Sequence, residues 1–205
     1  MEFENARGYG IIIVLAFRLS ILKGSGFMKR LRIASFLVDY TRLKPGLYVS
    51  RIDRYSSSPI TTFDLRLIPP NSEIKKPLDS AAMHTIEHIG ATFLRNDAAW
   101  GKNIVYFGPM GCRTGFYLLV AGSFKRADEM IQVADRQVTS VLDLVKKLCW
   151  YVMSYTSEIP GATPEECGNY RDHNLLGAKM AMHNYYTILA QTSEELGYDQ
   201  FVYPE

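Results

Sequence analysis

Two histidines four residues apart, His84 and His88, form the pattern in this sequence that points most clearly to a chemical function. Residues i and i+4 of a helix lie one turn apart on the same face, so both imidazoles can bind one metal ion. Glu87, three residues after His84, lies near that face and can move protons beside the metal. A third protein ligand and an open fourth position would complete a catalytic site rather than a structural one.

The third ligand has few candidates, since the chain contains three cysteines and only two histidines besides this pair. Cys167 lies in a polar loop sequence, and a thiolate there would suit zinc or ferrous iron. We keep His173 as a reserve ligand. Cys149 lies within an apolar stretch and is interpreted as a core residue. Spacing alone does not identify the ligand, because Cys167 is far from the histidine pair along the chain.

A further thiol, Cys112, lies in the glycine-rich segment Gly108–Gly115. A free cysteine is most often a small buried hydrophobic residue. Here, however, the flanking glycines allow the backbone to approach a ligand closely, and the neighbouring Arg113 together with a nearby cation would favour the thiolate form. Predicted strands on both sides place Cys112 at a strand-to-strand junction, where catalytic groups are often exposed.

The elements that must position these residues begin with a predicted β-hairpin. Residues 47–53 and 61–67 have the composition of strands, and the connector Ser56–Pro59 is typical of a turn. In the second strand, apolar side chains alternate with Asp64 and Arg66. This alternation predicts a strand that is buried on one face only.

Helices and two further strands account for the rest of the expected fold. Asp79 or Ser80 is a suitable N-cap for the helix that carries the histidine pair, which we expect to end near Arg95 or Asn96. The other predicted elements are a buried strand at 104–107, a strand at 116–120, a long helix at 126–150 and a last helix at 175–189. Strands and helices do not alternate strictly. The predicted fold class is therefore α+β, a single domain with a mainly antiparallel sheet packed against helices.

Composition and charge exclude several classes of protein. With 205 residues, 47% hydrophobic and 21% charged, the chain is typical of one globular domain. The formal net charge is only +2 and no basic tract is interleaved with aromatic residues, which argues against a nucleic-acid partner. Three widely separated cysteines do not form a disulfide framework. We therefore expect reduced thiols and a cytoplasmic protein.

The N-terminal region contains a mostly apolar run, Ile11–Leu22, which is too short to span a bilayer. Its length fits the core of a signal peptide, but two glutamates precede it and no A-x-A-like cleavage site follows. We interpret residues 1–27 as an extension upstream of a natural start at Met28, and residues 28–205 as a metal-dependent domain. No stable membrane association is expected.

Several stretches of this sequence resemble the S-ribosylhomocysteine lyase (LuxS) family: residues 83–88, 108–117 and 166–168, with Ser35–Phe36 and Phe63–Arg66 similar to two further segments. The similarity covers roughly residues 31–189 in the same order, which is far more specific than the helix motif alone. It implies a LuxS/metallopeptidase-like fold. It also implies cleavage of the thioether of S-ribosylhomocysteine to homocysteine and 4,5-dihydroxy-2,3-pentanedione, the autoinducer-2 precursor. The sequence leaves open whether that product serves quorum sensing or only recycling in methionine metabolism.

The resemblance also implies a metal centre and an assembly. His84, His88 and Cys167 would bind one divalent metal per subunit, Fe²⁺ natively and Zn²⁺ as a possible substitute. The family works as a homodimer with two equivalent sites at the subunit interface. Residues 1–27 have no counterpart in the family, which agrees with a start at Met28.

The reaction implied by the resemblance needs groups that move protons. A thioether carbon–sulfur bond resists hydrolysis but breaks by elimination once a carbonyl lies β to the sulfur, so the sugar carbonyl must migrate from C1 to C3. A bound metal stabilises the enediolates of this migration as a Lewis acid, and two groups shuttle protons between adjacent carbons. By resemblance these groups are Cys112, as thiolate, and Glu87. Arg66 and Ser35 would contact the ribose or help set the local charge.

Two positions depart from the family. Tyr40 stands where the family usually has a histidine, and Tyr106 where it usually has an aspartate; both positions line the sugar site. Tyrosine can hydrogen-bond a hydroxyl, but it is bulkier and is not ionised near neutral pH. The resemblance therefore predicts a divergent lyase with altered substrate fit or rate.

Two other functions remain open at this point. The order H-x-x-E-H is that of the inverzincin metallopeptidases, in which the glutamate is the general base for a metal-bound water. Such an enzyme needs a downstream carboxylate ligand and gives Cys112 and Cys167 no task. The second is a non-catalytic metal- or sugar-binding relative, which the substitutions at Tyr40 and Tyr106 would allow. Retention of Glu87 and Cys112 argues against it, since simple binding needs neither.

Overall fold

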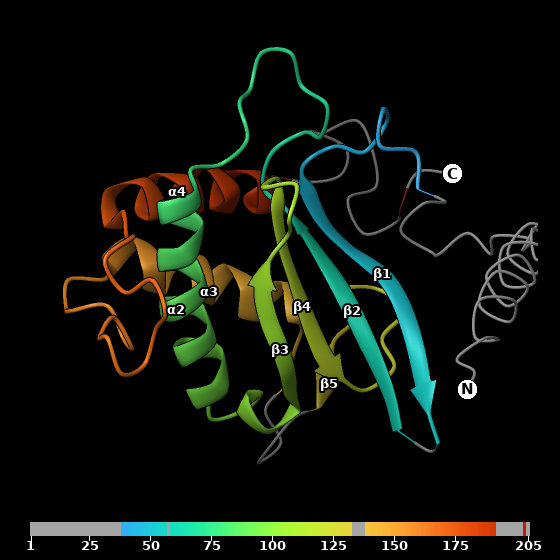
Figure 1. Ribbon diagram of the computed structural model, residues 1–205. Coiled ribbons are helices and arrows are strands. Elements are labelled where there is room, and N and C mark those ends of the chain that lie inside the picture. The colour runs from blue at the N-terminus through green and yellow to red at the C-terminus, as the bar shows by residue number, and fades with distance from the viewer. Residues whose placement is uncertain (1–37, 57, 133–137, 192–202, 204–205) are drawn as a thin grey trace, which may run out of the picture. The chain divides into compact units, whose positions relative to one another are not determined.

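The computed structural model describes residues 38–56, 58–132, 138–191 and 203 (Figure 1). All of them belong to one compact unit that spans residues 34–205. The expected N-terminal extension, 1–27, and Ser35 lie outside the described residues. In the part of the chain that is described, no helix is both long enough and apolar enough to cross a membrane.

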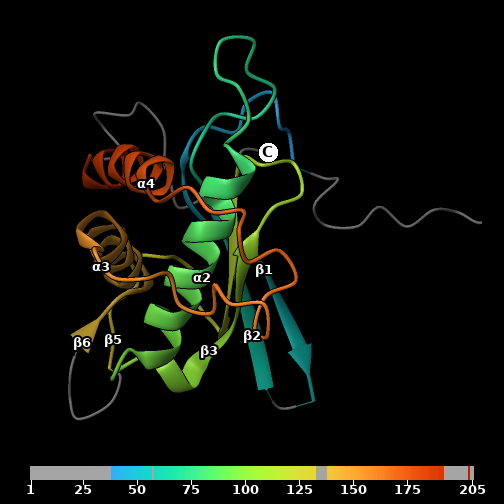
Figure 2. The same cartoon turned by 60° about the vertical axis from the view of Figure 1, so that its left-hand side comes forward.

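A four-stranded sheet in the order β1-β2-β4-β3 forms the centre of the fold, and all of its pairings are antiparallel. Its strands are β1 (Gly46–Tyr55), β2 (Ser58–Arg66), β3 (Ile104–Pro109) and β4 (Gly115–Ala121). The helices α2 (Ser80–Asn96), α3 (Val141–Ser154) and α4 (Leu175–Ala190) lie together on one face of this sheet (Figures 1 and 2), and a single 3₁₀ turn, η2 (Gly101–Asn103), follows α2. The predicted α+β fold class and the predicted hairpin are confirmed.

Helix α2 forms where the sequence predicts it. The side chain of Asp79 accepts a hydrogen bond from Ala82 N and caps the helix. Apolar residues at helical spacing are buried in the core: Met83, Ile86, Ile89 and Leu94. Packing of this stripe leaves the histidine pair and Glu87 on a half-buried face, where they remain accessible.

Strand β2 corrects the prediction that one of its faces is solvated. Asp64 and Arg66 are fully buried, with 0% and 1% of their surfaces exposed. The two side chains form an ion pair with Arg66 Nη2 2.5 Å from Asp64 Oδ2. Each charge is therefore compensated by the other, which lets an alternating strand be buried on both faces. Strand β3 is more exposed than predicted. Val105 and Tyr106 are 37% and 47% exposed, although the sequence predicted a buried strand.

The predicted long helix at 126–150 is wrong. Two short strands of this stretch, β5 (Ile131–Gln132) and β6 (Val138–Thr139), pair antiparallel, and α3 begins only at Val141. Ser140 and Asp143 form a capping box in which each side chain accepts from the other's backbone N–H. This Ser-x-x-Asp signature starts a helix, and it fixes the true N-terminus of α3.

Gly115 is required where β4 begins beside β2. A Cβ at this position would overlap the carbonyl oxygen of Leu65, a backbone atom held in the β2–β4 pairing. We expect Gly115→Ala to lower the free energy of unfolding by about 1–3 kcal/mol or more, because the backbone must shift to relieve the overlap. Urea unfolding of the metal-loaded protein measures this. Gly111→Ala is the matched control, since its Cβ would meet nothing within 4 Å. Equal stability of the two variants would contradict the prediction.

Candidate metal centre and active site

The histidine pair of α2 and a cysteine that is distant in sequence come together in the fold. One nitrogen each of His84 and His88 and the sulfur of Cys167 lie within 4.8 Å of one another. Cys167 comes from the loop between α3 and α4, and its Sγ is 3.3 Å from His84 Nε2. Tetrahedral ligands at about 2.0–2.3 Å from a zinc-like ion stand roughly 3.3–3.8 Å apart. The separation of sulfur and nitrogen is therefore that of two ligands of one metal ion.

Backbone carbonyls orient both imidazoles. His84 Nδ1 lies 2.9 Å from Asp172 O, and His88 Nδ1 lies 2.7 Å from Pro160 O. A carbonyl oxygen only accepts hydrogen bonds, so each ring carries its proton on Nδ1. The Nε2 lone pairs are left available for a metal, which is the arrangement that protein-bound metals generally require. The residues thus fit a divalent ion.

The loop that supplies Cys167 is shaped to fit against α2. Gly161 adopts a left-handed backbone conformation with φ of +68°, and a Cβ there would lie 3.3 Å from His88 Nδ1. A residue without a side chain is therefore needed beside this ring. The backbone N–H of Cys167 donates to Thr163 O, and that of Asn169 donates to Cys167 Sγ at 3.4 Å. These bonds turn the sulfur toward the two imidazoles.

His173, the reserve ligand, lies beside the metal group without belonging to it. Its ring stacks on that of His84, with centroids 4.3 Å apart and an interplanar angle of 15°. Its Nδ1 is 3.2 Å from Thr85 Oγ1, whose own hydroxyl donates to Ala81 O. Burial lowers the pKa of His173, and the charges of His84 and His88 lower it further. A neutral His173 therefore packs against the rings of His84 and His88 and restricts their movement.

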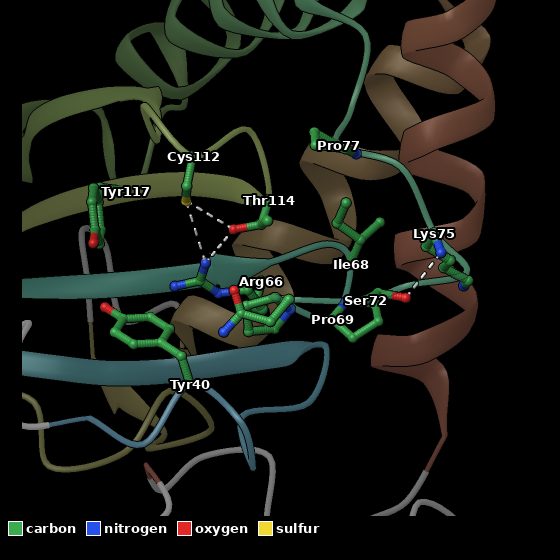
Figure 3. A pocket seen from close by; sticks show the side chains of 12 residues that line it. Tyr40, Arg66, Ile68, Pro69, Ser72, Lys75, Pro77, Cys112, Thr114 and Tyr117 are labelled. Carbon is green, nitrogen blue, oxygen red and sulfur yellow. Dashed lines mark hydrogen bonds between the residues drawn. The ribbon is translucent and has the colours of Figure 1, made fainter.

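A second group of side chains surrounds Cys112, which is exposed in the turn between β3 and β4 (Figure 3). Cys112 Sγ is 3.0 Å from Thr114 Oγ1 and 3.9 Å from Arg66 Nη1. Arg66 Nη1 also donates to Thr114 Oγ1. The cation in contact with the thiol is therefore Arg66 of β2, whereas the sequence named Arg113 and left the second, nearby cation unidentified. Thr114 was missed, because only the fold shows that its hydroxyl bridges Cys112 and Arg66.

A cavity of about 540 Å³ opens beside Cys112. Tyr40 and Tyr117 lie on the side of it opposite the segment that follows β2, and the Tyr40 ring centroid is 5.6 Å from Arg66 Cζ (Figure 3). The remaining lining residues are Ile68, Pro69, Pro70, Asn71, Ser72, Lys75, Pro77 and Thr114. Burial raises the pKa values of Tyr40 and Tyr117, so both present neutral phenols. The volume is in the range of small-molecule sites.

The cavity gathers some of the predicted substrate-binding residues and not others. Arg66 and Tyr40 line it, and Tyr117 is a lining residue that the sequence did not suggest. Tyr106 does not line it and is 47% exposed on β3. Its role in substrate binding remains a prediction, as does that of Ser35.

The Cys112 turn is tied to the start of the helix that carries the metal group. Leu78 N donates to Arg113 O at 2.9 Å, one residue before the N-cap of α2. The same turn accepts hydrogen bonds at Thr114 O from the residues that follow β2. Both the turn and the N-terminal end of α2 consequently lie at one end of the sheet (Figures 1 and 2).

Comparisons with known proteins agree with this geometry. Residues 33–195 match the family model described as S-ribosylhomocysteinase (LuxS). A protein of Borrelia garinii subsp. bavariensis named S-ribosylhomocysteine lyase is 46% identical over 164 residues, which covers 80% of this chain and 96% of the relative. A protein of the same name from Desulfotalea psychrophila is 49% identical over 156 residues, 76% of this chain and 89% of the relative. One from Clostridium acetobutylicum is 41% identical over 174 residues, 85% of this chain and 99% of the relative.

Proposed function

This chain belongs to the S-ribosylhomocysteinase (LuxS) family, and we propose that His84, His88 and Cys167 bind the metal ion of its lyase reaction. The reaction cleaves S-ribosylhomocysteine to homocysteine and 4,5-dihydroxy-2,3-pentanedione, the precursor in autoinducer-2 synthesis. We propose Cys112 and Glu87 as its proton carriers. Arg66, Tyr40, Ser35 and Tyr106 are the proposed substrate-binding residues.

The observation that supports the metal assignment is the donor set. Two imidazole Nε2 atoms and one thiolate form a set that suits ferrous iron or zinc. We propose Fe²⁺ as the native ion, with Zn²⁺ as a possible substitute. Three protein ligands leave a further position open to substrate. When bound there, a divalent ion supplies Lewis-acid chemistry to the sugar oxygens of the substrate.

The proposed proton carriers follow from the reaction. In the elimination, a base removes the proton on C4, next to the C3 carbonyl, and the electron pair forms the C4–C5 double bond of an enol. The enol becomes the second ketone of the product when the C4 hydroxyl loses its proton and C5 gains one. Homocysteine leaves from C5 with its sulfur as thiolate, which then takes up a proton. The preceding migration of the carbonyl from C1 to C3 also moves protons between neighbouring carbons and oxygens. Glu87 on α2 and Cys112 in the β3–β4 turn are the groups we assign to these transfers.

Substrate binding is proposed for the cavity beside Cys112. Its guanidinium and phenol groups can hydrogen-bond to sugar hydroxyls. Arg66 additionally provides a fixed positive charge beside the thiol. Burial, the largest single influence, lowers the pKa of Arg66, but the charge of Asp64 and the hydrogen bond to it, together with the charges of Tyr203 and Cys112, raise that pKa above its usual value. The homodimer with sites at the subunit interface and the cytoplasmic location are proposed from the family resemblance, and free thiols suit such a compartment.

The inverzincin alternative is not favoured. Its metal would need a downstream carboxylate ligand, whereas the group formed by the described residues contains a cysteine sulfur in that place. The relatives reported above are lyases, and none of their names is that of a peptidase.

Homocysteine release from S-ribosylhomocysteine tests the assignment. We expect anaerobically purified, Fe²⁺-loaded protein to release the thiol, detected with a thiol reagent and corrected for protein cysteines. Glu87→Gln should lower the rate by roughly 10²–10⁴-fold at unchanged metal content, because it removes one proton carrier and no ligand. No release from folded, metal-loaded protein would contradict the assignment and would point to Tyr40 and Tyr106 as residues that redirect the site.

A further inference from the structure

Tyr203 lies beyond residues 33–195, the part of the chain that matches the family, yet it contacts the active-site network. Its hydroxyl donates a hydrogen bond of 2.6 Å to Asp64 Oδ2. Its ring packs against Tyr48 of β1, with centroids 5.3 Å apart and an interplanar angle of 31°. The side chain of Tyr203 is therefore anchored at both its ring and its hydroxyl.

Asp64 connects Tyr203 to the thiol. The same Oδ2 atom that accepts from Tyr203 also accepts from Arg66 Nη2, and the other end of that guanidinium reaches Thr114 Oγ1 and Cys112 Sγ. Tyr203, Asp64, Arg66 and Cys112 thus form a continuous series of contacts. Nothing in the family resemblance assigns a role to Tyr203.

The burial of Asp64 explains why a second donor is needed. Asp64 is completely buried, and its Oδ1 has no hydrogen-bond partner among the described residues. Burial raises the pKa of Asp64, and the charge of Arg66 and the hydrogen bond from Tyr203 counteract it. Burial and the charge of Asp64 also raise the pKa of Tyr203, so its hydroxyl keeps its proton and acts as donor. A carboxylate in this position depends on both donors at Oδ2.

We propose that Tyr203 is a positioning residue of the active site, whose hydroxyl holds Asp64 and thereby fixes the Arg66 guanidinium against Cys112. The inference rests on the proposed role of Cys112 as a proton carrier. Without the phenol, Asp64 draws the guanidinium toward itself, and the contacts of Arg66 with Thr114 and Cys112 weaken. The thiolate then loses part of its stabilising charge.

The pH dependence of Cys112 alkylation in the metal-loaded protein tests this. Among the described residues, Arg66 of β2, Tyr117 of β4 and Tyr40 interact with Cys112 through a contact or through charge, Lys75 lines the same cavity, and Arg113 is the next residue in the chain. Tyr203→Phe keeps the ring and its contact with Tyr48. We expect it to move the midpoint of iodoacetamide alkylation at Cys112 upward by roughly 0.5 pH unit or more, and to lower kcat about fivefold with little change in KM.

Tyr185→Phe is the matched control. Tyr185 is also buried and donates through its hydroxyl to Gly46 O at 2.9 Å, whereas the hydrogen bonds that Asp64 accepts from described residues come from Arg66 and Tyr203. Tyr185→Phe should lower the free energy of unfolding, while the pH midpoint of Cys112 alkylation and kcat stay at wild-type values. An unchanged midpoint in folded Tyr203→Phe would overturn the proposal. Full alkylation of Cys112 in the wild type tests the proposed function separately. Homocysteine release that survived this alkylation would refute the role of the thiol as a proton carrier. The shift of the alkylation midpoint in Tyr203→Phe would still decide the role of Tyr203.

Discussion

Replacing Cys112 with alanine is expected to lower kcat for homocysteine release by about 10³-fold while the metal content stays unchanged. Cys112 is the exposed thiol beside the cavity, in contact with Arg66 and Thr114, and it is not part of the metal group. The substitution therefore removes a proton carrier without removing a ligand. Steady-state kinetics and metal analysis of the same preparation measure both quantities.

Cys149→Ala is the control for this variant. Cys149 is fully buried in α3, and burial raises the pKa of its thiol strongly, so it is an inert core residue. We expect this variant to lose some stability and to keep its turnover and metal. Turnover of Cys112→Ala within tenfold of the wild type would contradict the proposed mechanism. Peptide hydrolysis that survived in Cys112→Ala would instead revive the metallopeptidase alternative.

The sequence predicted those elements whose signals are local. Helix α2 has an N-cap at Asp79 and an apolar stripe at helical spacing, and both act within a few residues. The hairpin of β1 and β2 is likewise specified by a turn between two strand-forming runs. The long helix at 126–150 failed for a local reason as well: its apolar spacing was followed through Ser140, although Ser140 and Asp143 mark a helix start.

The parts of the site that the residue pattern alone could not predict depend on contacts between distant segments. Cys167 Sγ lies beside His84 across 83 residues of sequence. The residue types made Cys167 one candidate third ligand among several, and only the family resemblance chose it. The alternation of β2 predicted a solvated face, but Asp64 is buried there because Arg66 and Tyr203 both donate to it. Tyr203 is distant from every motif in the sequence. Its contact with Asp64 can be found only from the fold.

Removal of the third ligand should have the largest effect on the metal centre. We expect Cys167→Ala to weaken metal binding by more than about 100-fold, since even the loss of a residue that only orients a ligand costs about 10–100-fold. Homocysteine release should fall with metal occupancy. The measurement is a competition titration of apo-protein with Fe²⁺ or Zn²⁺ against a chelator of known affinity.

Thermal unfolding distinguishes lost binding from lost structure in this variant. A ligand that binds only the folded state stabilises it by RT ln(1 + [L]/Kd), so saturating metal raises the wild-type Tm. Cys167→Ala should resemble the wild-type apo-protein and gain much less from added metal. This follows because Cys167 is only partly buried in a surface loop, whereas the fully buried Cys149 contributes to the core. Cys149→Ala should show the reverse, a lower Tm without metal and a full increase with it. If Cys167→Ala bound the ion as tightly as Cys149→Ala, the sulfur would not be a ligand, and His173, stacked on His84, would become the candidate to replace it.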